Sequence, residues 1–223
     1  TMLAAVLVGW WASAIAIAQS YPVKPGRIIV PSAPGVGTDL LARGAAQQLA
    51  ARLGQAFVVE NRVGADGVIG MKACAKAPAD GYTLCSGASN TLIYNVVLRQ
   101  DLPYSGKSFA GVIHTGYFDS ALMVNSEVPV RTLQELLDYA KSKNQFTWAT
   151  FDSVGTGYLY MRWLQANRGA ALLHVPYKAP PQMLQAVITG EANGGIYAIG
   201  QLGAQVKSGK VRFCACAMGA KAN

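Results

Sequence analysis

Apolar and polar positions along the chain follow two rhythms, and each rhythm predicts one kind of element. Short apolar runs bounded by Gly, Pro or Asn are typical of buried strands, whereas apolar residues three or four apart are typical of helices. In the first half, Leu41, Ala45, Leu49 and Leu53 share one face of an expected helix over residues 39–53, which ends at Gly54. The other elements expected there are strands over 27–31, 57–60 and 82–86 and helices over 68–77 and 90–99.

The same alternation returns in the second half after a less regular middle. Thr132 and Glu135 have the spacing of a capping box, which predicts that a helix begins there and runs to about residue 142. Further helices are expected over 158–167 and 181–189, and strands over 112–114, 122–125, 146–150, 172–175, 195–199 and 211–217. Alternating strands and helices are typical of a mostly parallel sheet. The alternation in both halves predicts two α/β lobes. Because no low-complexity linker separates them, we expect crossing strands near 112–124 and 211–217 to join the lobes.

The first 18 residues differ from the rest because they carry no charged side chain. Ala16, Ile17 and Ala18 form an A-x-A pattern before Gln19, which is typical of a signal-peptidase site. An uncleaved membrane anchor is the alternative, but the apolar run is short for a spanning helix. We therefore expect a signal peptide over 1–18, lobe 1 over 19–115, lobe 2 over 116–212, and a crossing strand back to lobe 1 over 213–223.

Composition narrows the class of function. The chain has 223 residues, of which 52% are hydrophobic and 13% charged, so it can fill a sizeable core. The net charge is +8, but Lys and Arg are scattered and aromatic residues do not interleave with them. That distribution argues against nucleic-acid binding. It fits attraction of small anions, or simply a solvated basic surface.

Cysteine and histidine positions predict no metal site. No C-x-x-C occurs, and His114 and His174 lie in apolar strand contexts without metal-ligand spacing to any cysteine. Both histidines are expected in the core or at strand ends rather than as catalytic bases. The four cysteines are interpreted as buried free thiols, with a Cys74–Cys85 disulfide as the alternative, and Cys214 and Cys216 are expected on one face of the last strand.

The most informative segment is V-P-S-A-P-G-V-G-T-D over residues 30–39. It predicts a strand that feeds a Gly-rich turn ending at a helix N-terminus, where unpaired N–H groups and the positive end of the helix dipole suit a carboxylate or a phosphate. Val36-Gly37-Thr38 recurs as Val154-Gly155-Thr156, again between a strand and a helix. In two facing lobes, both helix N-termini could point into one cleft.

Enzymatic readings of this turn are weaker. Gly35 and Gly37 with Glu60 at the end of the next strand match part of a dinucleotide-binding turn, but Leu40 replaces its third glycine and Asp39 would repel a pyrophosphate. The Walker lysine and G-x-S-x-G are both absent. Asp39 is expected to be the helix N-cap, and whether it also contacts a ligand stays open at this point. We therefore assign no catalytic residue and no cofactor.

Four motifs together resemble a known family. They are the segment over 30–39, Val58-Val59-Glu60-Asn61-Arg62-x-Gly64-Ala65, Asp80-Gly81-Tyr82-Thr83-Leu84 and His174-Val175-Pro176-Tyr177-Lys178. Their order and spacing are similar to those of the Bug (TctC-like) solute receptors of tripartite tricarboxylate transporters. The resemblance implies an α/β periplasmic binding protein fold of type II, the Venus flytrap, with two lobes around a cleft. It further implies an exported, non-catalytic receptor that passes a small organic carboxylate to membrane permease subunits; a receptor that signals to a membrane kinase is the alternative.

The resemblance also implies which residues contact the ligand. Carried over by position, they are Ser32, Pro34, Gly35, Val36, Gly37, Thr38, Asp39, Ser86, Ala88, Ser89, Asn90, Thr150, Ser153, Gly155, Thr156 and Tyr177. Lys178 either lines the cleft rim with Tyr177 or belongs to a structural turn.

The chain departs from the family pattern at several positions. Ser32 stands where an aromatic residue is common, and Val36 and Asp66 stand where Gly is usual. Val36 would be strained if its backbone took a positive φ. Family members also continue well past residue 223, so we expect the C-terminal part of lobe 1 to be missing and apolar surface of lobe 1 to be exposed, which favours instability or association.

Overall fold

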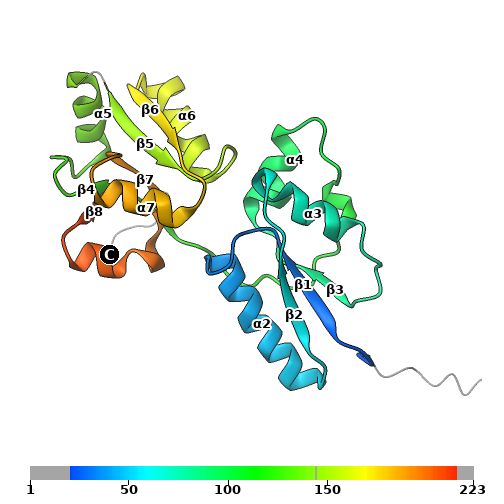
Figure 1. Cartoon of the computed structure of the whole chain (residues 1–223). Helices are drawn as coiled ribbons and strands as arrows, with labels where there is room; N and C mark the ends of the chain where they lie inside the picture. Colours follow the sequence, from blue (N-terminus) through cyan, green and yellow to red (C-terminus); the bar gives the residue numbers. More distant parts are fainter. Residues whose placement is uncertain (1–20, 144, 215–223) are drawn as a thin grey trace, which may run out of the picture.

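The computed structural model describes residues 21–143 and 145–214. Figure 1 shows two α/β bodies, lobe 1 formed by the first half of this part and lobe 2 by the second. The expected signal peptide over residues 1–18 lies outside the described residues. Among the residues that are described, no helix has the length and apolar character needed to cross a membrane.

Lobe 1 is built on a parallel sheet of three strands in the order β2-β1-β3. The strands are β1 (Gly26–Val30), β2 (Phe57–Asn61) and β3 (Thr83–Cys85), and the longer helices are α2 (Gly37–Leu53) and α3 (Val68–Ala75). Figure 1 shows α2 and α3 on opposite sides of this sheet. Ile28 and Val30 of β1 pack with Ala42 and Ala46 of α2 because alternate strand residues face the helix. The expected end of α2 at Gly54 is confirmed, with the glycine in the left-handed conformation at φ 68°.

The segment expected as one helix over 90–99 begins as a π-helical turn, η2 (Asn90–Tyr94), and continues as α4 (Asn95–Leu98). Two 3₁₀ turns, η1 (Ala65–Gly67) and η3 (Gly106–Ser108), complete lobe 1. The buried Tyr104 hydroxyl donates to the carbonyl of Thr91, 2.7 Å away, and so fixes η2 from outside.

Lobe 2 contains a mixed sheet of five strands in the order β6-β5-β7-β4-β8. The strands are β4 (Ser120–Asn125), β5 (Phe146–Thr150), β6 (Leu172–Pro176), β7 (Gly194–Ala198) and β8 (Val211–Phe213). The helices are α5 (Leu133–Ser142), α6 (Thr156–Arg168), α7 (Pro180–Ile188) and α8 (Gly203–Lys207), with the 3₁₀ turn η4 (Ile199–Gln201). β5 runs parallel to β6 and β7, whereas β4 is antiparallel to both β7 and β8.

The sheet of lobe 2 separates two apolar clusters. Trp148 and Phe146 are fully buried in one cluster, and Met183 and Val187 of α7 in the other. Thr132 is the N-cap of α5 as expected, since its Oγ1 accepts from the Glu135 N–H at 3.2 Å. The Glu135 carboxylate accepts from the Arg131 N–H, one residue earlier than in the expected capping box.

The predicted strand over 112–114 is wrong. Residues 110–119 have no regular structure and connect the lobes, and Val112 and Ile113 are 79% and 80% exposed. His114 is therefore exposed and not a core or strand residue, and its ring lies 4.4 Å from that of Tyr117. An apolar tripeptide forms a strand only where a partner strand receives its hydrogen bonds. The strand expected over 211–217 begins as β8, which belongs to the sheet of lobe 2. Residues 215–217 of that expected strand lie outside the described residues.

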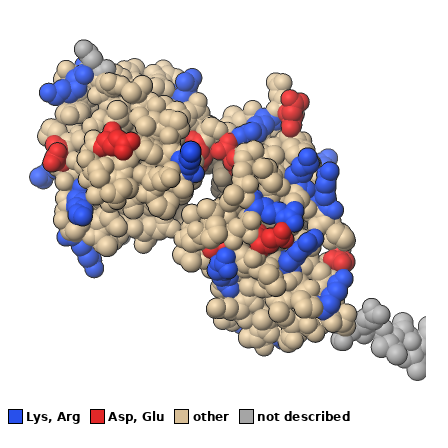
Figure 2. Space-filling model, viewed as in Figure 1, with Lys and Arg blue, Asp and Glu red and all other residues tan. Residues whose placement is uncertain are grey.

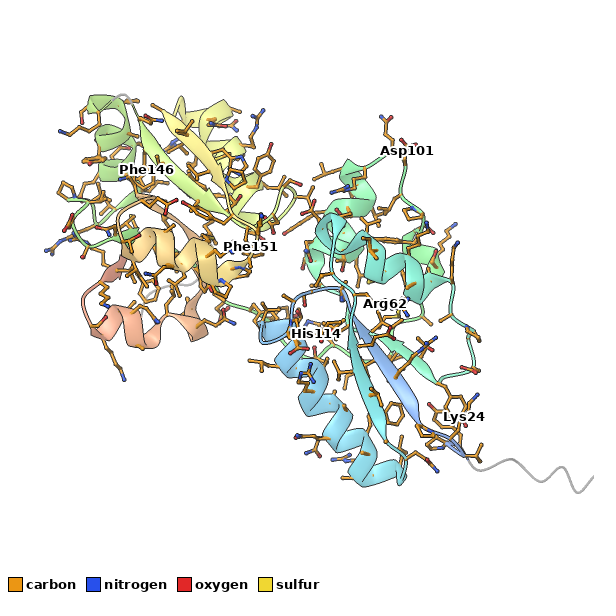
Figure 3. The ribbon with its side chains drawn as sticks, in the orientation of Figure 1. Lys24, Arg62, Asp101, His114, Phe146 and Phe151 are labelled. Atoms are coloured by element: carbon orange, nitrogen blue, oxygen red, sulfur yellow. A yellow bond between two sulfur atoms is a disulfide. The ribbon has the colours of Figure 1, made fainter. Side chains whose placement is uncertain are left out.

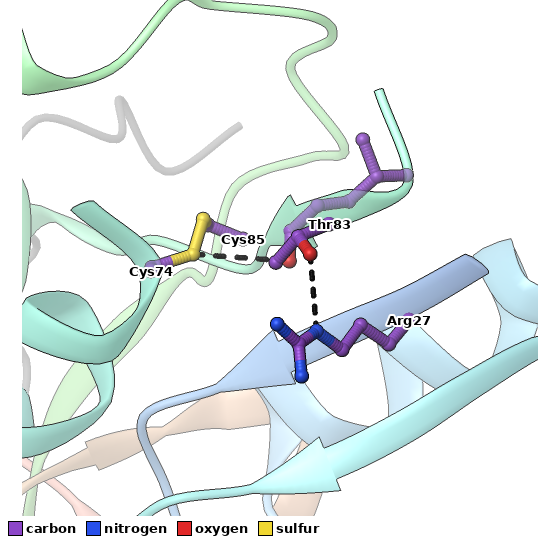
Figure 4. Close-up of a disulfide and its surroundings, with 5 residues drawn as sticks. Arg27, Cys74, Thr83 and Cys85 are labelled. Carbon is purple, nitrogen blue, oxygen red and sulfur yellow. Dashed lines mark hydrogen bonds between the residues drawn. A yellow bond between two sulfur atoms is a disulfide. The ribbon is translucent and has the colours of Figure 1, made fainter. Parts of the chain in front are cut away.

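Cys74 of α3 and Cys85 of β3 form a disulfide, with their Cα atoms 6.1 Å apart (Figure 4). The interpretation of this pair as free thiols is wrong, because α3 packs on β3 and brings the two side chains together. Cys214 is buried as expected, and Cys216 lies outside the described residues. Figure 4 also shows Arg27 Nε donating to Thr83 Oγ1 at 3.0 Å, a side-chain link between β1 and β3.

Exposed large apolar side chains are concentrated on lobe 1 rather than lobe 2. They come from α2, β2, α3, the η2–α4 segment and the connection between the lobes. They include Leu40, Leu41, Leu53, Val58, Ile69, Leu92, Ile93, Val97, Leu98, Val112, Ile113 and Phe118.

Candidate functional site

The turn between β1 and α2 has its left-handed residue at Gly35, whose φ is +81°. Val36 is the N-cap of α2 and has an extended backbone with φ −79° and ψ 164°. The expectation of strain at Val36 is therefore wrong, because Gly35 supplies the unusual dihedral and leaves Val36 in a conformation open to any residue.

Asp39 is not the N-cap, which corrects the expected role. It lies in the first turn of α2 and is 1% exposed. Its carboxylate accepts from the Gly35 N–H at 2.8 Å, Arg43 Nε at 2.9 Å and Asn61 Nδ2 at 2.8 Å. The hydrogen bond from Arg43, aided by Gly35 and Asn61, lowers the pKa of Asp39 to about 2 against the effect of burial. Asp39 thus stabilises the conformation of the turn from its buried side.

The rest of this turn is also held by side chains. The hydroxyls of Ser32 and Thr38 are hydrogen-bonded at 2.6 Å, and Asn61 Nδ2 donates to the Ser32 carbonyl at 3.0 Å. Gly37 lies against Phe118 of the connecting segment, and a Cβ at Gly37 would come within 2.4 Å of that ring. Pro34 and Gly35 are exposed at the tip of the turn.

The second predicted group in lobe 1 follows β3. Ser86 continues the sheet, since its N–H donates to the Ile29 carbonyl at 2.9 Å. Ala88 exchanges hydrogen bonds with Thr91 and so starts η2, while Ser89 is exposed and Asn90 half-buried. β1 and β3 are parallel neighbours, so both predicted groups of lobe 1 lie at the same edge of the sheet.

In lobe 2, Thr150 ends β5 and is buried. Its hydroxyl donates to the Asp152 carbonyl at 3.0 Å and lies 2.8 Å from His174 Nε2, so it is engaged within its own lobe. Gly155 is the N-cap of α6. Burial raises the pKa of Asp152 to about 6; the Gly155 N–H opposes this shift, and the negative charge of Asp66 adds to it.

The turn before α6 touches lobe 1 at two places. Ser153 Oγ donates to Asp66 Oδ2 of η1 at 2.7 Å, and Thr156 Oγ1 lies 3.4 Å from the Tyr94 hydroxyl of η2. Figure 3 places Phe151 on the side of lobe 2 that faces lobe 1, and Figure 2 shows acidic and basic side chains together where the two bodies meet. The structure therefore brings two predicted residues, Ser153 and Thr156, to the contact between the lobes.

Tyr177 is hydrogen-bonded within lobe 2 through both its backbone and its side chain. Its N–H donates to the Thr150 carbonyl at 2.7 Å, and its hydroxyl donates to Glu191 at 3.0 Å. Burial and the neighbouring carboxylate of Glu191 raise the pKa of this phenol. Lys178 is exposed.

Sequence reasoning missed the residues on the lobe 1 side of the contact, namely Asp66, Tyr94 and Arg99. A signal was present in Gly64-Ala65-Asp66-Gly67, where a charged residue interrupts a glycine-rich turn. Both Ala65 and Asp66 have positive φ, at 50° and 54°. Within residues 21–143 and 145–214 no cluster of His, Cys, Asp or Glu could hold a metal ion.

Two surface grooves lie elsewhere, on lobe 1. The larger, of 550 Å³, is lined by Lys24, Arg27, Glu60, Asp80, Tyr82 and neighbouring residues, and the smaller, of 220 Å³, by Arg43, Gln47, Phe57 and others. None of the predicted site residues lines either groove.

Comparison with known proteins gives a consistent picture. The family model described as tripartite tricarboxylate transporter family receptor matches residues 41–221. A UPF0065 protein of Bordetella bronchiseptica is 31% identical over 89% of this chain, and Protein BugT of Bordetella pertussis is 32% identical over 89% of it. The chain spans 59% and 62% of the length of these two relatives.

Solved structures agree. An R. palustris protein solved with adipate has a TM-score of 0.79 at 28% identity, and MatC from Rhodopseudomonas palustris with bound malate has 0.76 at 26%. Both likenesses cover 87% of this chain, and they cover 66% and 67% of the two neighbours.

Proposed function

Because this chain belongs to the tripartite tricarboxylate transporter receptor family, we propose that it is a periplasmic solute-binding receptor and not an enzyme. In this proposal it captures a small organic carboxylate between its two lobes and delivers it to the permease subunits of a tripartite transporter. The named ligands of two solved neighbours, adipate and malate, belong to this class of compound.

The observation that carries the proposal is the meeting of the α6 N-terminal turn with lobe 1. The first N–H groups of α6 have no partner inside the helix and suit a carboxylate oxygen. The turn before α2 offers a second such end, on the sheet edge that also carries Ser86–Asn90. A ligand that bonds both ends would favour the closed arrangement of the lobes, since only closure makes both contacts.

Lobe 1 fits a nucleotide less well. Asp39 already accepts the Gly35 N–H, and its buried negative charge lies behind the turn that a pyrophosphate would approach. That arrangement supports the carboxylate receptor over a nicotinamide-dependent enzyme, because a negative charge behind the turn opposes a doubly charged pyrophosphate more strongly than a single carboxylate.

Isothermal calorimetry with a panel of mono-, di- and tricarboxylates tests the proposal, with the matching amides and NAD as negative probes. We expect at least one carboxylate to bind and its amide not to bind. Thr156→Ala should weaken that affinity about tenfold by removing a hydroxyl at the α6 end, whereas Thr189→Ala, at the exposed end of α7, should leave it unchanged. Binding of NAD but of no carboxylate would overturn the proposal, and equal affinity in both variants would overturn the site.

A further inference from the structure

We propose that Asp66 and Ser153 form a pH-dependent latch that holds the lobes together in the ligand-free chain, and that a negative charge on Asp152 releases it. The inference rests on the proposed function only for the identity of the solute that is enclosed when the lobes close. It makes Asp66 a positioning residue, one that sets the distance between the lobes without touching the solute.

The lobe 1 half of the latch is rigidly held. Asp66 Oδ2 pairs with the guanidinium of Arg99, and the Asp66 carbonyl accepts from Asn95 Nδ2 at 3.0 Å. Asn95 is fully buried and in turn accepts from Arg99 Nε at 3.1 Å. The carboxylate is therefore fixed in direction before lobe 2 arrives, and Ser153 adds one hydrogen bond of 2.7 Å across the boundary.

The backbone at Asp66 argues that this carboxylate has a role. Asp66 has φ 54° and ψ 37°, in the left-handed region that favours glycine, and Ala65 before it also has positive φ. A residue held in such a conformation points to a function for its side chain when that side chain makes a specific contact. The Asp66 side chain, 19% exposed, pairs with Arg99 of its own lobe and accepts from Ser153 of the other lobe.

Asp152 supplies the pH dependence. Its carboxyl lies on the lobe 2 side of the latch, next to Ser153, and its pKa is raised by burial and by Asp66. Two further groups bear on it: Arg99 offsets part of the Asp66 charge, and His174 is linked to the Asp152 carbonyl through the Thr150 hydroxyl. Burial lowers the pKa of His174, which acts against a positive charge on this ring.

The direction of the effect follows from linkage. The charge of Asp66, on the other lobe, is one of the causes that raise the pKa of Asp152, so the arrangement that brings the two carboxylates together binds protons more tightly than one that separates them. Below about pH 6 Asp152 is neutral and the latch holds. As the pH rises through that value, carboxylates on opposite lobes repel each other and separation is favoured.

Small-angle X-ray scattering coupled to gel filtration tests the latch on the full chain without any ligand. We expect the radius of gyration, about 17 Å for a compact chain of this length, to increase by about 1 Å between about pH 5 and about pH 7.5, with a midpoint near pH 6. Asp152→Asn should stay compact at both pH values, and Ser153→Ala should be expanded at both. Asp138→Asn, a matched change on the exposed face of α5, should behave like the unmodified chain.

Asp66→Gly distinguishes loss of the latch from loss of folding. Glycine suits the positive φ, so this variant should melt at the same temperature as the unmodified chain or higher, and yet be expanded at both pH values. A pH-independent radius in the unmodified chain, or an Asp152→Asn variant that retains the full pH response, would overturn the latch. Neither result bears on carboxylate binding, and a failure of carboxylate binding in calorimetry would leave the scattering result standing.

Discussion

The carboxylate of Asp39 accepts a hydrogen bond from the backbone N–H of Gly35, 2.8 Å away, so α2 holds the turn that leads into it. This bond, with Arg43 and Asn61, keeps a buried charge satisfied inside lobe 1. The acidic residue of the Gly-rich motif is thus a support for the turn, and its contribution is measurable as stability.

Asp39→Asn should destabilise lobe 1 by roughly 2 kcal/mol at neutral pH. The folded-state pKa of Asp39 lies below its usual value of 3.8, at about 2. Its stabilisation is therefore complete above about pH 4 and is lost as the pH falls through about 2. Urea denaturation at several pH values in this range gives the free energy of unfolding as a function of pH. The slope of that dependence should be smaller in Asp39→Asn than in the unmodified chain. Asp101→Asn, at an exposed position, serves as the control, and equal slopes in both variants would contradict the prediction.

Gly37→Ala should disturb the contact between α2 and the connecting segment. The added Cβ would meet the Phe118 ring at 2.4 Å, and overpacking of this kind costs about 1–3 kcal/mol. Phe118 is a flexible, half-exposed side chain, so Phe118→Ala in the same chain should recover most of the loss. A double-mutant cycle on thermal unfolding measures the coupling. Additive effects of the two substitutions would show that the contact is not formed.

Removal of the Cys74–Cys85 disulfide should lower the free energy of unfolding by about 3 kcal/mol, as expected for a closed loop with a sequence separation of 11. The double variant Cys74→Ala/Cys85→Ala and the reduced unmodified chain should lose the same amount in denaturant titrations. A reducing agent should then have no further effect on the double variant. If it lowers the stability of the double variant equally, the loss does not come from this bond.

Polar substitutions on the exposed apolar surface of lobe 1 should reduce self-association. Val97 is 75% exposed and Ile113 80%, and apolar patches of this kind favour association. Val97→Ser/Ile113→Ser should shift sedimentation velocity profiles toward the monomer without lowering the melting temperature. The matched change Leu173→Ser, on lobe 2, should have a smaller effect, and an unchanged profile for the lobe 1 variant would contradict the prediction.

The sequence predicted most of the fold because strongly patterned segments do not depend on distant partners. The strand over 146–150 is confirmed to the residue, and α2 and α7 begin within two residues of their expected starts. The family match confirms the resemblance, and the solved neighbours confirm the two-lobed α/β fold. The strand over 112–114 failed because its exposed residues have no partner strand, which no local pattern reveals.

The site was harder to predict than the fold. Ser153 and Thr156 could be selected because they lie in a recognisable turn, but their partners Asp66 and Tyr94 are distant in sequence and belong to segments without a ligand-binding pattern. The roles of Asp39 and Val36 were misjudged for a related reason. Which residue of a turn takes the left-handed conformation, and where a carboxylate points, depends on contacts with Asn61 and Arg43 that only the folded chain contains.

The connecting segment over 110–119 has a mechanical consequence. Within the described residues the chain passes between the lobes once, since β8 stays in the sheet of lobe 2. Residues 110–119 have no regular structure, so their backbone dihedrals can take up a change in the angle between the two bodies while both sheets stay intact. Fixing the two bodies at one angle therefore costs the dihedral freedom of this segment and not the packing of either lobe.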